Sequence, residues 1–167
     1  MTIYANRGKV LENLIIASNR QYKLKKIAAI QKVEQPVRVS KKHPGGKVTG
    51  QLLQSTVDFI GHYRGRGVAF DAKETQNKTS FPLSNLEQHQ YNFLEDYHDS
   101  GGMAFLVISF TKLNKFYLLP FPLLREYWQR AEDGGPKSIK LIDFTIPVKT
   151  GRGAALDYSA PLEKSFE

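Results

Sequence analysis

The chain has 167 residues, of which 41% are apolar and 24% are charged. This length and composition predict one soluble globular domain covering residues 1–167. No apolar run reaches the roughly 18 residues that cross a bilayer, and the first residues lack the pattern of a signal peptide. We therefore expect a cytoplasmic protein with no membrane partner. The sequence contains no cysteine, which excludes disulfides and zinc sites built from thiolates.

The charge of the chain points to an anionic partner. Lysine and arginine number 24 against 16 acidic residues, giving a net charge of +8. The basic residues are concentrated in the first third of the chain: Lys23, Lys25, Lys26, Lys32, Arg38, Lys41, Lys42 and Lys47. This clustering predicts a surface that binds a polyanion. On charge alone, a soluble protein that is simply basic is an open alternative.

The first third of the chain predicts a helix, a strand and a segment outside the core. Apolar residues at helical spacing predict a helix over Val10–Tyr22. The run 25–33 predicts a short strand that ends before Pro36. Residues 40–55 contain Pro44, three glycines and three lysines with little apolar periodicity. We expect this stretch to be a flexible loop or a projecting arm.

Two strand-like runs, "TVDFIG" and "GVAFDAK", predict a β-hairpin after this segment. A two-residue turn at Arg64 and Gly65 would place Asp58 directly opposite Asp71. Alternation along a strand places Asp71 and Lys73 on one face. A slip of one residue in the pairing would send Asp58 to the other face.

The rest of the chain predicts alternating helices and strands. Ser84 and Glu87 have the spacing of a capping box, and the helix they begin would stop at Gly101. "MAFLVISF" is typical of a buried central strand, "KFYLLP" of a further strand, and "PLLREYWQRAEDGG" of a helix. A last strand is expected at Leu141–Val148, followed by irregular chain. The order of elements predicts an α/β fold with a mixed central sheet flanked by helices.

The acidic and basic residues of the hairpin also predict a catalytic metal site. Two carboxylates on neighbouring strands repel one another unless a cation lies between them, and Mg²⁺ prefers oxygen ligands of this kind. A lysine beside them can hold or help deprotonate a water bound to the metal. Asp58, Asp71 and Lys73 therefore match the PD-(D/E)xK nuclease signature. The pattern alone leaves open a surface hairpin with solvated ion pairs, each contributing about 0 to 1 kcal/mol.

Longer motifs are more specific. "NRG" (6–8), "LE" (11–12), "KETQNKTSFPLSN" (73–85), "HQ" (89–90) and "AALDY" (154–158) resemble the RecU family of Holliday junction resolvases. That family occurs in low-GC Gram-positive bacteria and their phages, and the compactness of this chain fits a phage or prophage member. The resemblance implies a PD-(D/E)xK fold and a homodimeric, Mg²⁺-dependent endonuclease that nicks opposing strands of a four-way DNA junction symmetrically.

The resemblance also assigns roles to individual residues. It implies that Asp58 and Asp71 bind Mg²⁺, with Mn²⁺ expected to substitute, and that Lys73 is the catalytic lysine. Glu12, on the first helix, is expected to supply a third acid at the catalytic site. Asp71 stands where family members often have glutamate, which shortens that ligand by one methylene. The family's stalk, which enters the centre of the junction, corresponds here to a basic arm at about 33–54.

Six residues are expected to contact DNA: Arg7, Lys41, Lys42, Lys47, Thr79 and Gln90. Contacts from the arm lysines to phosphates would set affinity and salt dependence rather than sequence preference. The alternatives are a solvated loop for the lysines, a structural cap near the amino terminus for Arg7, turn chemistry for Thr79, and, for Gln90, a helix position that lines the site or faces solvent.

Three functions stay open from the sequence. The favoured one is a junction-resolving nuclease acting in recombination and repair at the nucleoid, with a recombinase or branch-migration helicase as a further partner. The second is a nuclease of the same fold for another branched DNA, because a metal site does not choose the DNA shape. The third is a DNA-binding or strand-annealing protein without catalysis. The intact set of Asp58, Asp71 and Lys73 argues against the third.

Overall fold

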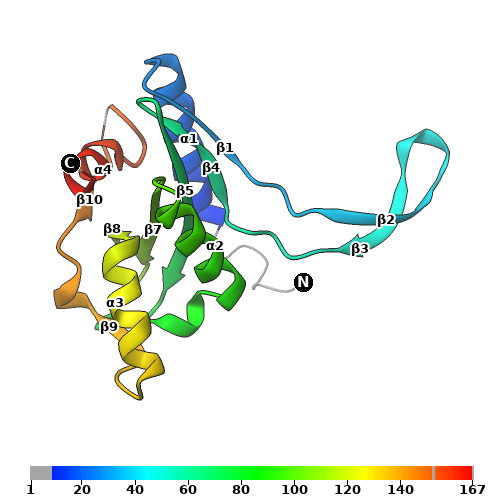
Figure 1. The fold of residues 1–167 in the computed structure, drawn as a ribbon. Coiled ribbons are helices and arrows are strands. Elements are labelled where there is room, and N and C mark those ends of the chain that lie inside the picture. The colour runs from blue at the N-terminus through cyan, green and yellow to red at the C-terminus, as the bar shows by residue number, and fades with distance from the viewer. Residues whose placement is uncertain (1–8, 152, 167) are drawn as a thin grey trace.

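A mixed sheet lies at the centre of the computed structural model, which describes residues 9–151 and 153–166 (Figure 1). Its strands, in spatial order, are β1 (Ala28–Lys32), β4 (Phe59–Tyr63), β5 (Arg66–Thr75), β7 (Met103–Phe110), β8 (Lys115–Pro120) and β10 (Pro147–Val148). Only β5 and β7 pair in parallel among these neighbours in the described chain; the other pairs are antiparallel. The parallel pair requires a crossover, and the chain makes it through α2 (Gln88–Asp99).

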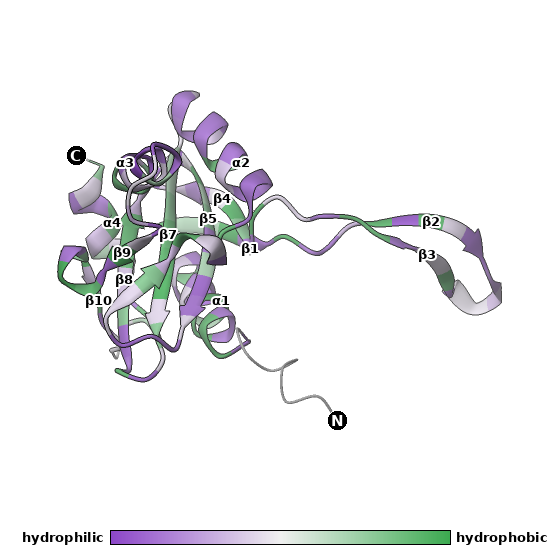
Figure 2. Ribbon diagram, turned by 90° about the horizontal axis from the view of Figure 1, so that it is seen from below, coloured by the Kyte–Doolittle hydropathy of each residue, from purple (hydrophilic) through white to green (hydrophobic). Residues whose placement is uncertain are grey.

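Helices cover both faces of this sheet. α1 (Lys9–Leu24) and α4 (Ser159–Ser165) pack on one face, and α2 and α3 (Phe121–Glu132) pack on the other. All of β7 is buried, as its continuous apolar run predicts. Figure 2 shows the central strands largely in the green of apolar residues and α2 largely in the purple of polar ones. The predicted mixed α/β fold is therefore confirmed.

The two cores differ in the side chains that fill them. On the α1 face, Phe70 stacks between Phe59 and Phe105, with ring centroids 5.0 and 4.5 Å apart. On the α2 and α3 face, the ring of Trp128 stacks on Tyr91 at 4.4 Å. Such pairs add to the stabilisation from burial alone.

No helix within the described residues is both long and apolar enough to span a membrane.

The arm is a two-stranded ribbon that extends well away from the body (Figures 1 and 2). β2 (Val37–Lys42) pairs antiparallel with β3 (Val48–Leu52), and a 3-10 turn over Pro44–Gly46 joins them. Gly45 and Gly46 both have positive φ at this tip, which glycine adopts at little cost. Every residue of both strands is exposed. Of the two alternatives for this segment, the projecting arm is the one observed.

The C-terminal part differs from the prediction. Leu141–Asp143 forms a 3-10 turn, so the predicted strand Leu141–Val148 is wrong except at its end, where β10 lies. The reason is that the chain just before it is already paired: β9 (Ser138–Lys140) joins β6 (Ser80–Pro82) in a separate two-stranded sheet. The stretch expected to be irregular ends in α4, whose Leu162 is buried against the sheet.

Candidate active site

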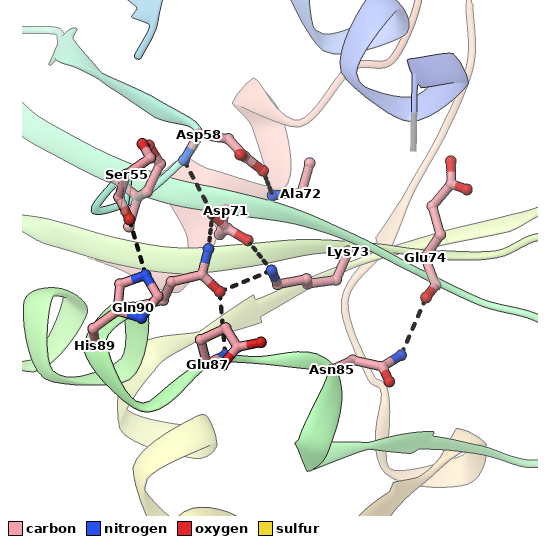
Figure 3. A network of polar contacts seen from close by, with 11 residues as sticks. Ser55, Asp58, Asp71, Ala72, Lys73, Glu74, Asn85, Glu87, His89 and Gln90 are labelled. Carbon is pink, nitrogen blue, oxygen red and sulfur yellow. Dashed lines mark hydrogen bonds and ion pairs between the residues drawn. The ribbon is translucent and has the colours of Figure 1, made fainter. Parts of the chain in front are cut away.

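The β4–β5 hairpin has the predicted register. Phe59 pairs with Phe70 across a turn at Arg64 and Gly65, both with positive φ, the backbone of a type I′ turn. Asp58 therefore lies opposite Asp71, one residue before β4 begins. Each of the two carboxylates accepts a hydrogen bond from the backbone of the facing segment. The Asp58 backbone N–H donates to Oδ1 of Asp71 at 3.0 Å, and the Ala72 N–H donates to Oδ2 of Asp58 at 2.9 Å (Figure 3).

Lys73 lies beside Asp71 on one face of β5, also as predicted. Its Nζ is 2.6 Å from Oδ2 of Asp71, whose side chain is 0% exposed while that of Lys73 is 17% exposed. This Oδ2 is buried, and the Lys73 ammonium is its one recorded partner among the described residues. A buried carboxylate oxygen needs a positive charge beside it, which a lysine or a bound cation can supply.

Gln90, in the first turn of α2, joins the acid to the lysine. Its Oε1 accepts hydrogen bonds from Nζ of Lys73 at 2.9 Å and from the Glu87 backbone N–H at 3.2 Å. Its Nε2 donates to Oδ1 of Asp71 at 3.1 Å. The sequence predicts Gln90 as a DNA contact that either lines the site or faces solvent, but not these bonds, because they depend on how α2 packs against β5. Figure 3 shows the three side chains meeting at one point.

The predicted capping box at Ser84 and Glu87 is wrong. The helix begins at Gln88, with Glu87 as its N-cap and Gln90 reaching back to the Glu87 backbone. Ser84 lies in a 3-10 turn, Leu83–Asn85, which is closed by a bond from the Leu86 N–H to Leu83. The N-cap is therefore Glu87, three residues later than the expected Ser84. Glutamate takes the place of the usual serine or threonine. The same glutamine caps the helix and orders the site.

Burial controls the protonation of Asp71. Loss of hydration raises its pKa to about 7, the Lys73 ammonium opposes that rise, and the charge of Asp58 adds to it. The pKa of this carboxyl therefore lies near neutral pH, so a bound cation would compete with a proton for it.

Glu12 does not contact the aspartates. Its carboxylate forms an ion pair with Nζ of Lys32, on β1. The hydrogen bond to Glu12 raises the pKa of Lys32, and the charges of Glu34 and Asp58 act in the same direction. Lys32 pairs in register with Phe59, which places it next to Asp58. The sequence counts Lys32 only among the basic residues, because nothing local shows that β1 lies beside β4.

The donor set fits a hard divalent cation. The described residues contain no group of three or more acidic, histidine or cysteine side chains arranged to hold a metal. The carboxylates of Asp58 and Asp71 are the oxygen ligands that the described residues bring together, since the amide oxygen of Gln90 already accepts a hydrogen bond from Lys73. Mg²⁺ is usually bound by one or two carboxylates and keeps several waters, so this set is sufficient. The role of Glu12 as a third acid stays a prediction.

The predicted DNA contacts lie in separate regions. Lys41, Lys42 and Lys47 are exposed on the arm. Thr79 precedes β6, and its carbonyl accepts a hydrogen bond from the Leu141 N–H at 2.8 Å. Arg7 lies outside the described residues. The base of the arm is tied to α2 by a hydrogen bond of 2.9 Å between Nε2 of His89 and the carbonyl of Ser55, so the arm is anchored beside the site.

A mixed sheet that holds two carboxylates and a lysine on adjoining strands is the arrangement of the PD-(D/E)xK nucleases. The sequence matches the RecU family, described as recombination protein U, over residues 6–164. The chain belongs to this family.

Curated relatives agree with this placement. "Holliday junction resolvase RecU" of Pediococcus pentosaceus is 41% identical over 148 residues, covering 85% of this chain and 74% of that protein. The protein of the same name from Geobacillus sp. (strain WCH70) is 35% identical over 172 residues, covering 98% and 86%. A solved structure of Hjc, a Holliday junction resolvase from Archaeoglobus fulgidus, aligns with a TM-score of 0.44 at 13% identity, covering 69% of this chain and 78% of that one.

Proposed function

We propose that this protein is a Mg²⁺-dependent endonuclease that resolves Holliday junctions by paired symmetric nicks, acting as a homodimer on four-way DNA. The observation that carries the proposal is the convergence of Asp58, Asp71, Lys73 and Gln90 on one buried point. Relatives named as Holliday junction resolvases support the choice of substrate.

The residues of the site have separate roles in metal binding, orientation and charge stabilisation. Asp58 and Asp71 would hold Mg²⁺, which when bound lowers the pKa of a water and screens phosphate charge. The Asp58 N–H and the Gln90 amide fix Oδ1 of Asp71 from two sides, so Oδ2 keeps its direction. Lys73 brings a positive charge to the same point, where its ammonium can donate to a non-bridging phosphate oxygen or to the attacking water.

Gln90 holds Lys73 in place. The ammonium has two recorded partners, Oδ2 of Asp71 and Oε1 of Gln90. If the carboxylate turns to a cation, the amide oxygen still holds the lysine over the site. Pre-positioning of this kind lowers the cost of reaching the transition state.

The arm supports the choice of a branched substrate. It is basic, exposed along its whole length, and anchored next to the catalytic residues. A ribbon of this shape can enter the open centre of a four-way junction, whereas a linear duplex has no such opening. Two opposed nicks require two sites, which is why we propose a homodimer.

The test is cleavage of a synthetic four-way junction beside linear duplex of the same sequence, with Mg²⁺ and with chelator. Paired nicks confined to the junction and dependent on Mg²⁺ are the expected result. Binding without cutting would overturn the nuclease assignment. Equal cutting of linear duplex would retain the nuclease and overturn the junction. Light scattering of the free protein would test the dimer.

A further inference from the structure

A basic hollow of about 780 Å³ lies apart from the candidate active site and from the arm. It lies where β6, the start of β8 and β9 meet, at the lower end of the body in Figure 1. We call it the lysine hollow. Its polar lining includes Lys78, Lys115, Lys140, Thr79, Ser80 and Ser138. Nothing in the catalytic arrangement uses these residues together.

The charge of the hollow is uncompensated. Lys78, Lys115 and Lys140 come from three different segments, and no acidic residue lines the hollow. Within the described chain, none of the three ammonium groups forms an ion pair. Asp143, which is near in sequence, interacts with the hydroxyl of Tyr127 instead. Three like charges without counter-ions attract an anion.

Hydroxyl groups add hydrogen-bond donors on a fixed frame. Thr79, Ser80 and Ser138 lie along the β6–β9 pair, in which Ser80 is paired with Lys140. The bond from the Leu141 N–H to the Thr79 carbonyl, at 2.8 Å, continues this pairing. The donors therefore belong to paired backbone rather than to a free loop. Lysine and hydroxyl donors together are the groups that contact DNA phosphates.

The hollow faces the same side of the sheet as Lys73. Lys73 pairs with Ile108 on β7, and Ile108 pairs with Tyr117 on β8. Residues directly opposite one another in a sheet share a face, and Tyr117 lines the hollow. Lys78 follows Lys73 after only five residues of chain. Because α2 and α3 cover the middle of this face, DNA leaving the site past the end of β5 would pass over the hollow.

We propose that the lysine hollow binds the phosphodiester backbone of one duplex arm of the junction, on the side of the active site away from the stalk-like arm. This inference rests on the proposed function, because it takes four-way DNA as the substrate. It adds a contact outside both the catalytic residues and the arm. The hollow would hold one duplex arm against the body while the ribbon occupies the branch point.

The test compares two paired variants with the same change in charge. Lys78→Gln with Lys140→Gln neutralises the hollow, and Arg20→Gln with Lys164→Gln neutralises two exposed basic residues on α1 and α4, which pack on the opposite face of the sheet. Fluorescence anisotropy of a labelled four-way junction gives log affinity against log salt. The hollow pair should lower the slope by about 1.8, the loss of two phosphate contacts. The control pair should leave the slope near the wild-type value.

A second substrate locates the contact. A junction with arms trimmed to a few base pairs removes the DNA that would cover the hollow, so wild type and the hollow pair should bind it with similar affinity. Equal slopes for the hollow and control pairs on full-length arms would overturn the proposal. The proposal would also be overturned if the hollow pair changed the oligomeric state and left the DNA affinity unchanged. The exposed Ile142 beside the hollow would then mark a protein interface.

The same preparations separate this inference from the proposed function. If wild type nicks the junction and the hollow pair binds like the control pair, only the hollow assignment fails. If wild type neither binds nor cuts four-way DNA, both fail. Equal thermal unfolding of the two pairs shows that neither result comes from misfolding.

Discussion

The catalytic residues and the arm are held in opposite ways. Asp71 is fully buried and receives hydrogen bonds from a neighbouring strand and from α2. The strands of the arm are exposed throughout, and within the described residues their backbone bonds run to one another and across the base at Pro36 and Leu53. The buried site has one arrangement fixed by packing. An isolated ribbon gains little stability from its own contacts and can adapt to what it binds.

This difference separates chemistry from the choice of substrate. A site that must direct a carboxylate and an ammonium within hydrogen-bond distance needs a rigid frame. A basic ribbon that enters a DNA junction needs reach and charge rather than fixed side chains. The account therefore predicts that changes in the body alter the rate of cleavage, and that changes in the arm alter which DNA is cut.

The largest effect is expected from Lys73→Ala. Loss of the ammonium removes charge stabilisation at the reacting phosphate, so cleavage of a four-way junction should fall by about 10³-fold. Junction affinity, measured by gel shift in the absence of Mg²⁺, should stay within about twofold. Lys112→Ala, an exposed lysine in the β7–β8 turn, is the matched control. Undiminished cleavage by the Lys73 variant would remove this residue from the site.

The arm should show the reverse pattern. Replacing Lys41, Lys42 and Lys47 by Gln removes three exposed charges, so the slope of log affinity against log salt should fall by about 2.7. Thermal unfolding should not change, because the arm contributes no residue to either core cluster. A large drop in Tm would show that the arm packs against the body.

Gln90→Ala tests the link between α2 and β5. We expect cleavage to fall by about 10- to 100-fold, the usual cost of losing a group that orients a metal ligand. Loss of the cap should lower stability by about 1 kcal/mol. Gln88→Ala is the control, because Gln88 lies in the same turn but bonds only to Asn92 among the recorded contacts. Equal rates for the two variants would make Gln90 a capping residue only.

The smallest effect concerns pH and metal. The pKa of Asp71 is raised to about 7, against about 3.9 in an unfolded chain. A raised pKa means that stabilisation is full below about pH 4 and is lost as the pH rises through about 7. In chelator, the Tm of wild type relative to Asp71→Asn should therefore fall by about 5 °C between pH 5 and pH 8.

Adding Mg²⁺ at pH 8 should reverse this loss in wild type, because the cation replaces the proton. At 100 times its Kd the gain would be about 2.7 kcal/mol. Asp71→Asn should show neither the pH slope nor the response to Mg²⁺. A wild-type Tm that is independent of both would contradict the assignment of Asp71 as a metal ligand.

The sequence predicts the parts of the site that depend on local rules. Alternation along β5 and the turn at Arg64 and Gly65 were enough to place Asp58, Asp71 and Lys73. The sequence leaves Gln90 either lining the site or facing solvent, because its position depends on how α2 packs across β5. Lys32 was missed for the same reason, since the pairing of β1 with β4 spans the whole arm.

The arm and the C-terminal part show two further limits. Glycines and a shift in register between Val39 and Lys41 interrupt the alternation that would reveal a ribbon. The pairing of β6 with β9 joins residues that are far apart in the chain, and nothing in either short segment favours its partner. The positions of these elements are set by tertiary contacts rather than by local preference.

The most direct test of the account is removal of the arm. The Leu53 N–H already donates to the Pro36 carbonyl at 2.8 Å, so a Gly-Gly link can replace residues 37–52 without disturbing the body. The ratio of junction to linear-duplex cleavage in Mg²⁺ is then compared with that of wild type. The account predicts that Mg²⁺-dependent nicking persists and that the preference for the junction is lost. A variant that still prefers the junction, or one that folds normally and nicks no DNA, would contradict it.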